Sequence, residues 1–325
     1  MAQRSNRSRG ASGRPGARRS SRRAGPRLNL GGCAGLLVLL GVVILTVALL
    51  LRRTSPSNDD GHLFLSRFLS TPTADRAPTA TPAPARGASP RPVVFLDPGH
   101  GGVDEGTRGQ AAGGQEVLEK TTTLAIAEKT AAVLQADGMG VVLSRTDDSL
   151  PGSRPSDYTS DGKLLTPQGV LSDLQRRIDR ANASGAQVLL SIHLNGFTDP
   201  AVGGTETFYD PARPFADSNQ RFAQLVQTKV VAALRTGGYN VPDRGVTDDT
   251  TLQGDDFGAL GVPYNHLVLL GPEVPGRLRA SQMPGALSEP LFLTNPVGAT
   301  AASQAETQDA LAHAYADAIE TFLRG

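Results

Sequence analysis

The stretch that decides the fold is Val93-Val-Phe-Leu-Asp-Pro-Gly-His-Gly-Gly102. Its first four residues are apolar, with β-branched and aromatic side chains, which predicts a short buried strand. Asp97-Pro98-Gly99 ends this strand abruptly. His100 therefore lies at the carboxyl end of a strand, on a glycine-rich turn that lets another group approach closely. This placement suits a functional site more than a core.

Strand-like and helix-like segments alternate after residue 92. The predicted strands are Val93–Leu96, Val141–Ser144, Gln187–Ile192, a short strand closed by Phe208-Tyr209, His266–Leu270 and Ala286–Leu293. The predicted helices are Glu119–Asp137, one opened by Thr166-Pro167, Phe215–Arg235 and Ala301–Leu323. Polar stretches at Asp147–Lys163 and Asp243–Gly258 predict loops. The alternation predicts a single α/β domain with a largely parallel central sheet flanked by helices.

Residues 31–51 carry no charge and are long enough to cross the hydrocarbon core of a bilayer. Nine arginines and no acidic residue precede them, so the positive-inside rule predicts a basic cytoplasmic tail over residues 1–30 and a transmembrane helix over residues 31–51. A cleaved signal peptide is the competing interpretation, but Arg52 and Arg53 follow where a small-residue cleavage site is needed. Residues 52–91, rich in Pro, Ser, Thr and Ala, predict an extended stalk. We expect a single-pass cell-membrane protein whose domain, residues 92–325, lies outside the cytoplasm.

The charge distribution argues against nucleic acid as a partner. Eleven of the 32 basic residues lie within residues 1–53, which hold no acidic residue, so the rest of the chain has 21 basic residues against 31 acidic ones. Phosphate backbones require clustered Lys and Arg side chains instead. Cys33 is the single cysteine, which excludes an intrachain disulfide. The exported domain must therefore be stabilised by its core or by a metal.

Two histidines at strand ends suggest a metal centre. His100 and His193 each follow a predicted buried strand, and ligands bind beyond the carboxyl ends of parallel strands. A catalytic zinc site usually takes three His or carboxylate ligands. Glu119, in the first turn of a predicted helix, is the candidate carboxylate, and Glu116 is its rival. Glu289, an acidic residue within an apolar strand, is the candidate base that deprotonates a water molecule. Hydrogen-bonded histidines and a glutamate that complements a helix dipole are the structural alternative.

Several separated motifs resemble those of the zinc-dependent N-acetylmuramoyl-L-alanine amidases of the amidase-3 type. The motifs, in the order of that family, are residues 96–102, 118–127, 144–148, 189–195 and 289–295. The resemblance covers roughly residues 92–325, and several motifs in register are far more specific than one short match.

The resemblance implies the roles of four residues. By position in the motifs, His100, Glu119 and His193 bind zinc, and Glu289 is the catalytic base. The implied reaction is hydrolysis of the amide that joins the lactyl group of N-acetylmuramic acid to L-alanine in peptidoglycan. Zinc would polarise the carbonyl and acidify a water molecule, and Glu289 would move the proton to the leaving amine. A protein activator is a further partner that we leave open.

Two features depart from the family pattern. Pro290 follows Glu289 where the family usually has glycine soon after, and proline removes a backbone donor. The segment Gly271–Pro284 also looks longer than usual. Two other functions therefore stay open: an inactive relative that binds peptidoglycan or a protein partner, and a zinc peptidase that acts on the stem peptide. Asp147–Lys163 and Gly271–Pro284 are also candidates for a lid over the site.

Five other polar residues have less specific interpretations. Asp97 could orient a ligating imidazole or cap its turn. Asn195 could contact substrate or hold its loop. We interpret Arg176 as a packing or ion-pair residue. His266 and His313 are interpreted as structural or solvated histidines.

Overall fold

The computed structural model describes residues 91–252 and 258–325. The predicted cytoplasmic tail, transmembrane helix and almost the whole predicted stalk lie outside these described ranges. Within them, no helix combines the length and apolar character needed to cross a bilayer.

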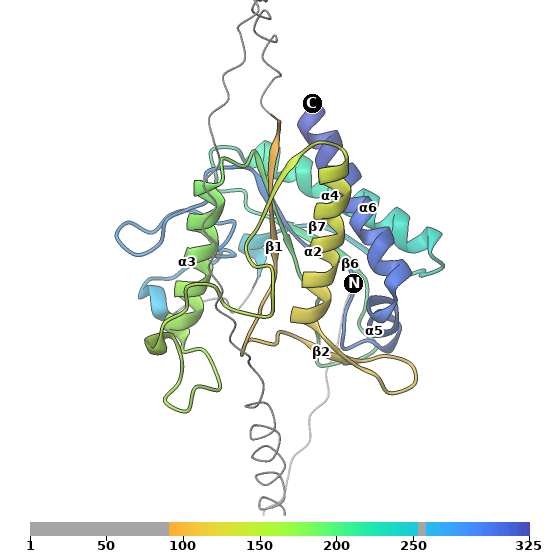
Figure 1. The fold of residues 1–325 in the computed structure, drawn as a ribbon, viewed down its shortest axis with the longest axis horizontal. Helices are drawn as coiled ribbons and strands as arrows, with labels where there is room; N and C mark the ends of the chain where they lie inside the picture. The colour runs from red at the N-terminus through yellow and green to blue at the C-terminus, as the bar shows by residue number, and fades with distance from the viewer. Residues whose placement is uncertain (1–90, 253–257) are drawn as a thin grey trace, which may run out of the picture. The chain divides into compact units, whose positions relative to one another are not determined.

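A six-stranded sheet forms the centre of the domain, with the strand order β4-β1-β5-β8-β6-β7. In Figure 1 its strand β1 lies between α3 (Pro167–Ala183) and α2 (Glu119–Ala136). The strands are β1 (Val93–Pro98), β4 (Gly140–Leu143), β5 (Val188–Ile192), β6 (Thr205–Tyr209), β7 (Asp243–Asp248) and β8 (Gly285–Glu289). All neighbouring strands are parallel except β6 and β8, which are antiparallel. A separate antiparallel hairpin is formed by β2 (Arg108–Gln110) and β3 (Glu116–Leu118). The predicted largely parallel sheet is therefore confirmed.

Helices cover both faces of the sheet. On one face lie α2 (Glu119–Ala136), α4 (Ala216–Thr236) and α6 (Ala305–Arg324), and on the other lies α3 (Pro167–Ala183) (Figure 1). Side chains of the central strands alternate between the two cores, since Leu96 and Leu190 pack under the first group of helices whereas Phe95 and Leu189 pack toward α3. Burial on both faces explains why β1 and β5 appear in the sequence as continuous apolar runs.

The predicted cap of one helix is used in the structure, and a second cap divides a predicted helix in two. The Thr166 side chain accepts a hydrogen bond from the Gly169 backbone N–H, with Pro167 in the first turn of α3. The predicted terminal helix is two helices, because Asn295 caps a separate α5 (Pro296–Ser303) and the chain turns at Gln304 before α6.

Three further element predictions are corrected by the structure. The predicted loop at Asp243–Gly258 contains β7, an edge strand paired with β6 whose polar residues carry no apolar alternation. His266–Leu270 is a turn and not a strand, and its buried leucines pack into the core beside α3. The predicted strand Ala286–Leu293 ends at Glu289, because Pro290 has no N–H with which to continue the ladder.

Candidate metal centre and active-site pocket

The three predicted metal ligands come together at one edge of the sheet. His100 follows β1, His193 follows β5, and Glu119 is the first residue of α2. Glu119 Oε1 lies 3.1 Å from His100 Nε2 and 3.1 Å from His193 Nδ1. The candidate ligand atoms of all three residues lie within 4.8 Å of one another. The parallel arrangement of β1 and β5 brings the two histidines to the same edge, as the sequence predicted.

The glycine-rich turn makes this approach possible. His100 itself has a φ of 62°, a left-handed conformation that is uncommon for a residue with a side chain. A Cβ atom on Gly99 would lie 2.4 Å from His193 Cε1, and one on Gly106 would lie 2.5 Å from Glu119 Oε2. Glycine at these two positions is therefore a requirement of the cluster and not only of the turn.

Backbone hydrogen bonds hold the Glu119 carboxylate in place. Its Oε1 accepts a hydrogen bond from Leu194 N at 2.9 Å, and its Oε2 accepts one from Thr107 N at 2.7 Å. The side chain is buried. Burial opposes ionisation, but the hydrogen bonds and charges of His100 and His193 hold the pKa of Glu119 well below its usual value. The cluster therefore presents an ionised oxygen shared between two imidazoles.

Asp104 orients the imidazole of His100. Its Oδ2 lies 2.9 Å from His100 Nδ1, which leaves Nε2 directed at Glu119. Burial alone would lower the pKa of His100, but the carboxylates of Asp104 and Glu119 raise it to about 10. The sequence analysis missed Asp104 and proposed Asp97 for this role. The signal available was an acidic residue four positions after the histidine within the same turn.

Asp97 instead belongs to a buried network beneath the turn. It accepts hydrogen bonds from Arg177 Nη1 at 2.9 Å and from Ser191 Oγ at 2.7 Å. Arg177 also donates to the His100 carbonyl at 2.7 Å and to Asp173 at 2.7 Å. Although burial opposes it, the Arg177 charge lowers the pKa of Asp97 to about 2. The network holds the backbone that carries His100, and the sequence did not reveal Arg177.

Two predictions about neighbouring charged residues are decided by the structure. Glu116, the rival ligand, is exposed and pairs with Arg108 at 3.1 Å, so it does not join the cluster. Arg176 forms an ion pair with Asp157 at 2.9 Å, which confirms its interpretation as an ion-pair residue.

Glu289 shares a pocket with the candidate ligands. It is the last residue of β8 and stands opposite Glu206 in β6. A pocket of about 660 Å³ is lined by His100, His193 and Glu289 among others. The Oε2 atom of Glu289 is buried and has no hydrogen-bond partner among the described residues. Burial and the nearby Glu119 charge raise the pKa of Glu289 well above its ordinary value.

Asn195 both holds its loop and lines the pocket. Its backbone N–H donates to the Leu291 carbonyl and its carbonyl accepts from Leu293 N, each at 2.8 Å. These bonds resume the pairing that Pro290 interrupts, so the proline leaves Glu289 at the strand end and beside the histidines. Among the described residues that line the pocket, none comes from Asp147–Lys163 or from Gly271–Pro284.

The donor set and its spacing fit a zinc ion. Two imidazole nitrogens and one carboxylate oxygen are a usual ligand set for catalytic zinc, which binds them at about 2.0–2.2 Å. Ligands at that radius around a tetrahedral ion lie roughly 3.3 Å apart, close to the 3.1 Å separations observed. Glu289 lines the same pocket but does not belong to the converging group, and its Oε2 has no hydrogen-bond partner among the described residues.

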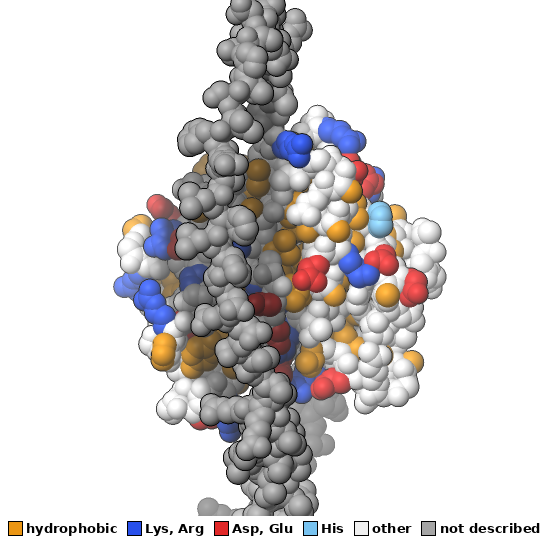
Figure 2. Space-filling view, in the orientation of Figure 1, with side chains coloured by type: hydrophobic (Ala, Val, Ile, Leu, Met, Phe, Trp, Pro, Cys, Tyr) orange, Lys and Arg blue, Asp and Glu red, His pale blue; other side chains and the backbone are white. Residues whose placement is uncertain are grey.

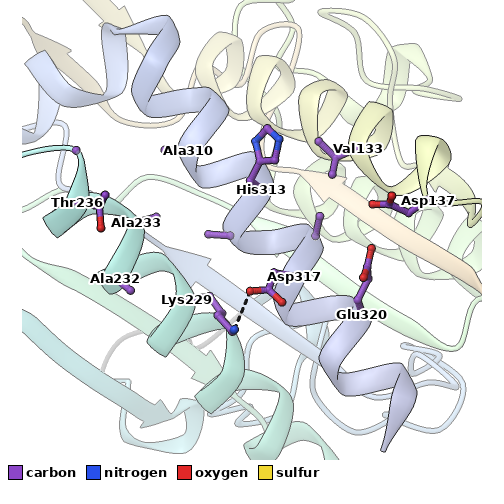
Figure 3. A pocket seen from close by; sticks show the side chains of 13 residues that line it. Val133, Asp137, Lys229, Ala232, Ala233, Thr236, Ala310, His313, Asp317 and Glu320 are labelled. Carbon is purple, nitrogen blue, oxygen red and sulfur yellow. Dashed lines mark ion pairs between the residues drawn. The ribbon is translucent and has the colours of Figure 1, made fainter.

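A larger groove lies on the helical face and is not part of this site. It has a volume of about 770 Å³ and is formed by α2, α4 and α6, whose Lys229 and Asp317 are joined by an ion pair at 2.7 Å (Figure 3). Its α2 contribution begins at Val133, roughly 21 Å along the helix from Glu119. On the described part of the face in Figure 2, basic and acidic side chains are interspersed.

Comparisons with known proteins identify the family of this chain. The sequence profile of the amidase-3 family, described as N-acetylmuramoyl-L-alanine amidase, matches residues 94–321. The N-acetylmuramoyl-L-alanine amidase AmiC of Neisseria meningitidis serogroup B is 33% identical over 239 residues, which are 70% of this chain and 51% of that protein. LytC of Bacillus subtilis, also an N-acetylmuramoyl-L-alanine amidase, is 30% identical over 232 residues, 71% of this chain and 36% of that protein.

A solved structure shows the same fold. The crystal structure of an N-acetylmuramoyl-L-alanine amidase from Clostridium difficile 630 has a TM-score of 0.51 and 30% sequence identity, and the match covers 73% of this chain and 99% of that one. With the profile match over most of its length, this chain belongs to the amidase-3 family of N-acetylmuramoyl-L-alanine amidases. The matched part spans about half the length of AmiC and about a third of LytC. The resemblance seen in the motifs is thereby confirmed.

Proposed function

We propose that this protein is a zinc-dependent N-acetylmuramoyl-L-alanine amidase that hydrolyses the amide bond between N-acetylmuramic acid and L-alanine in peptidoglycan. The observation that carries the proposal is the convergence of His100, Glu119 and His193, two of which, His100 and His193, line one pocket together with Glu289, whose Oε2 has no hydrogen-bond partner among the described residues. Membership of the family supplies the substrate class.

Each residue of the site has a distinct task in this proposal. His100, Glu119 and His193 would hold zinc, which supplies Lewis-acid activation of the amide carbonyl and of a water molecule. Glu289 takes a proton from the attacking water and delivers it to the nitrogen of L-alanine as that amine leaves. Its raised pKa suits a carboxyl that must accept and then release a proton. Asp104 keeps the Nδ1 atom of His100 occupied, so that Nε2 faces the centre.

We also propose that the chain is anchored in the cell membrane by residues 31–51, with the domain outside the cytoplasm. The support is the uncharged apolar run preceded by a basic tail. A protease added to intact cells should remove the domain if it is exported, and protection of the domain would contradict this topology. A protein activator remains a prediction. Measuring the amidase activity of this protein in cells that lack a candidate partner would test it.

Product analysis tests the proposed reaction. The zinc-loaded full chain is incubated with a defined muramoyl-peptide, and the products are identified by mass spectrometry. We expect free stem peptide with an unblocked L-alanine amine, and far less of it from the Glu289→Gln variant over the same time. Glu116→Gln is the matched control, since it changes an exposed glutamate outside the cluster. Cleavage between amino acids would instead identify a peptidase, and an intact substrate with zinc bound would identify an inactive binding relative.

A further inference from the structure

A second group of metal-ligating side chains lies outside the active-site pocket. It consists of Asp210, directly after β6, Asp249, directly after β7, and His266, in the turn-rich segment before β8. Their candidate ligand atoms all lie within 4.8 Å of one another. His266 Nδ1 is 2.7 Å from Asp210 Oδ2 and 3.6 Å from Asp249 Oδ1. We refer to these three residues as the second cluster.

The second cluster is separate from the first. Because β6 runs antiparallel to β8, the carboxyl ends of β6 and β7 point away from the edge that carries His100 and His193. Glu206 lies opposite Glu289, and Asp210 is four residues further along β6, roughly 13 Å away at the rise of a strand. The two clusters are therefore at different edges of the sheet.

Each carboxylate of the second cluster is anchored by one oxygen and leaves the other free. Asp210 Oδ1 accepts a hydrogen bond from Ala212 N at 2.6 Å, and Asp249 Oδ2 accepts one from Leu267 N at 3.0 Å. Both aspartates are fully buried, at 0% exposure. Asp210 Oδ2, Asp249 Oδ1 and His266 Nδ1 are buried and face one another, but their contacts, including the 2.7 Å approach of His266 Nδ1 to Asp210 Oδ2, do not have the geometry of a hydrogen bond. Such atoms are costly to bury unless a ligand satisfies them.

The negative charge of the two aspartates in the second cluster is not balanced by a Lys or Arg side chain among the described residues. Among the described residues, no Lys or Arg forms an ion pair with either aspartate. The nearby Arg213 guanidinium donates instead to the carbonyls of Leu270 and Gly271. The two buried carboxylates therefore face one imidazole and have no Lys or Arg partner among the described residues, an arrangement that a bound cation would stabilise.

We propose that Asp210, Asp249 and His266 bind a second zinc ion, which ties three loops of the domain together. The ligand chemistry selects the ion, because Ca²⁺ and Mg²⁺ take oxygen ligands whereas an imidazole with two carboxylates suits zinc. One divalent ion also neutralises both carboxylates. Thr251 and Leu267, close in sequence to Asp249 and His266, line the active-site pocket. The second ion would thus stabilise two segments that line the active-site pocket.

Zinc content tests this proposal separately from the proposed reaction. The full chain and its variants are dialysed against zinc, and bound metal is measured by mass spectrometry. We expect two zinc ions per chain in the wild type and one in the His100→Ala/His193→Ala variant, which lacks the first cluster. Asp249→Asn should also hold one ion. Asp248→Asn should keep two, because it makes the same charge change one residue away and retains the oxygen that caps the following 3₁₀ turn.

A thermal measurement covers the case in which Asp249→Asn does not fold. In the His100→Ala/His193→Ala protein, zinc at about 100 times its dissociation constant should raise Tm by roughly 5–10 °C. No bound zinc and no rise in Tm in this variant would overturn the proposal, because the two aspartates would then share a proton. One zinc ion in both the wild type and this variant would support the second cluster while contradicting the first as a zinc site.

Discussion

The two histidine-carboxylate clusters differ in how the chain builds them. His100 and His193 stand at the ends of two central strands, and glycines remove every side chain that would block their approach. The second cluster joins residues that follow β6 and β7 to a turn-rich segment. In the first cluster, Glu119 Oε1 faces two imidazoles, and Glu289 lines the adjoining pocket. In the second cluster, all three ligand atoms are buried. The first cluster therefore borders a pocket that a substrate could enter, whereas the ligand atoms of the second cluster are shielded from solvent.

The largest difference should appear when the carboxyl of Glu289 is removed. Glu289→Gln abolishes proton transfer but keeps the shape of the side chain, so we expect kcat to fall by about 10²–10⁴-fold. The zinc content should not change, since Glu289 is not one of the candidate ligands. Turnover of a defined muramoyl-peptide and bound zinc are measured on the same preparation. Loss of zinc together with turnover would show that Glu289 is a ligand and not the base.

Asp104→Asn tests how the first cluster is oriented. Asparagine keeps the size of the side chain but weakens the acceptor that faces His100 Nδ1, and loss of such a partner typically costs 10–100-fold in metal affinity. Competition with a zinc-binding dye gives the dissociation constant. The ion bound by the second cluster should be unaffected, so a two-site curve should shift at one site only. An equal shift at both sites would mean general destabilisation instead.

The first cluster could be predicted from the sequence motifs. The second could not, because β7 lacks the apolar alternation that predicts a strand. Buried parallel strands appear in the sequence as apolar runs, and their carboxyl ends meet at one edge of the sheet. This made it possible to place His100, Glu119, His193 and Glu289 together. β7 is a polar edge strand, and its sequence predicted a loop. Without β7 there was no reason to place Asp249 beside Asp210. Asp104 was missed although its spacing from His100 was a local signal, because its role also depends on the geometry of the turn. Arg177 was missed because it acts through a contact between distant segments, which no local pattern encodes.

Low pH should destabilise the buried network beneath the first cluster, because Asp97 becomes protonated. Its folded pKa of about 2 lies below the ordinary value of 3.8, so its contribution to stability is fully present above pH 4 and is lost as the pH falls toward 2. The difference corresponds to about 2 kcal/mol of unfolding free energy. Urea unfolding of the metal-free protein between pH 5 and pH 2 measures it. Asp97→Asn should have a shallower pH dependence than the wild type, and identical slopes would contradict the assignment.

Thr166→Ala gives the smallest expected effect and separates folding stability from metal binding. Thr166 caps α3, the helix that carries Arg177, and contacts neither cluster. Loss of the cap should lower the unfolding free energy by about 1 kcal/mol. Because Thr166 contacts neither cluster, this loss of global stability should leave the zinc content and both zinc affinities unchanged. If such a mild change also releases zinc from the second cluster, then that ion is held only by the marginal stability of its loops. If both ions remain, the losses seen in Asp104→Asn and Asp249→Asn can be assigned to the ligands themselves.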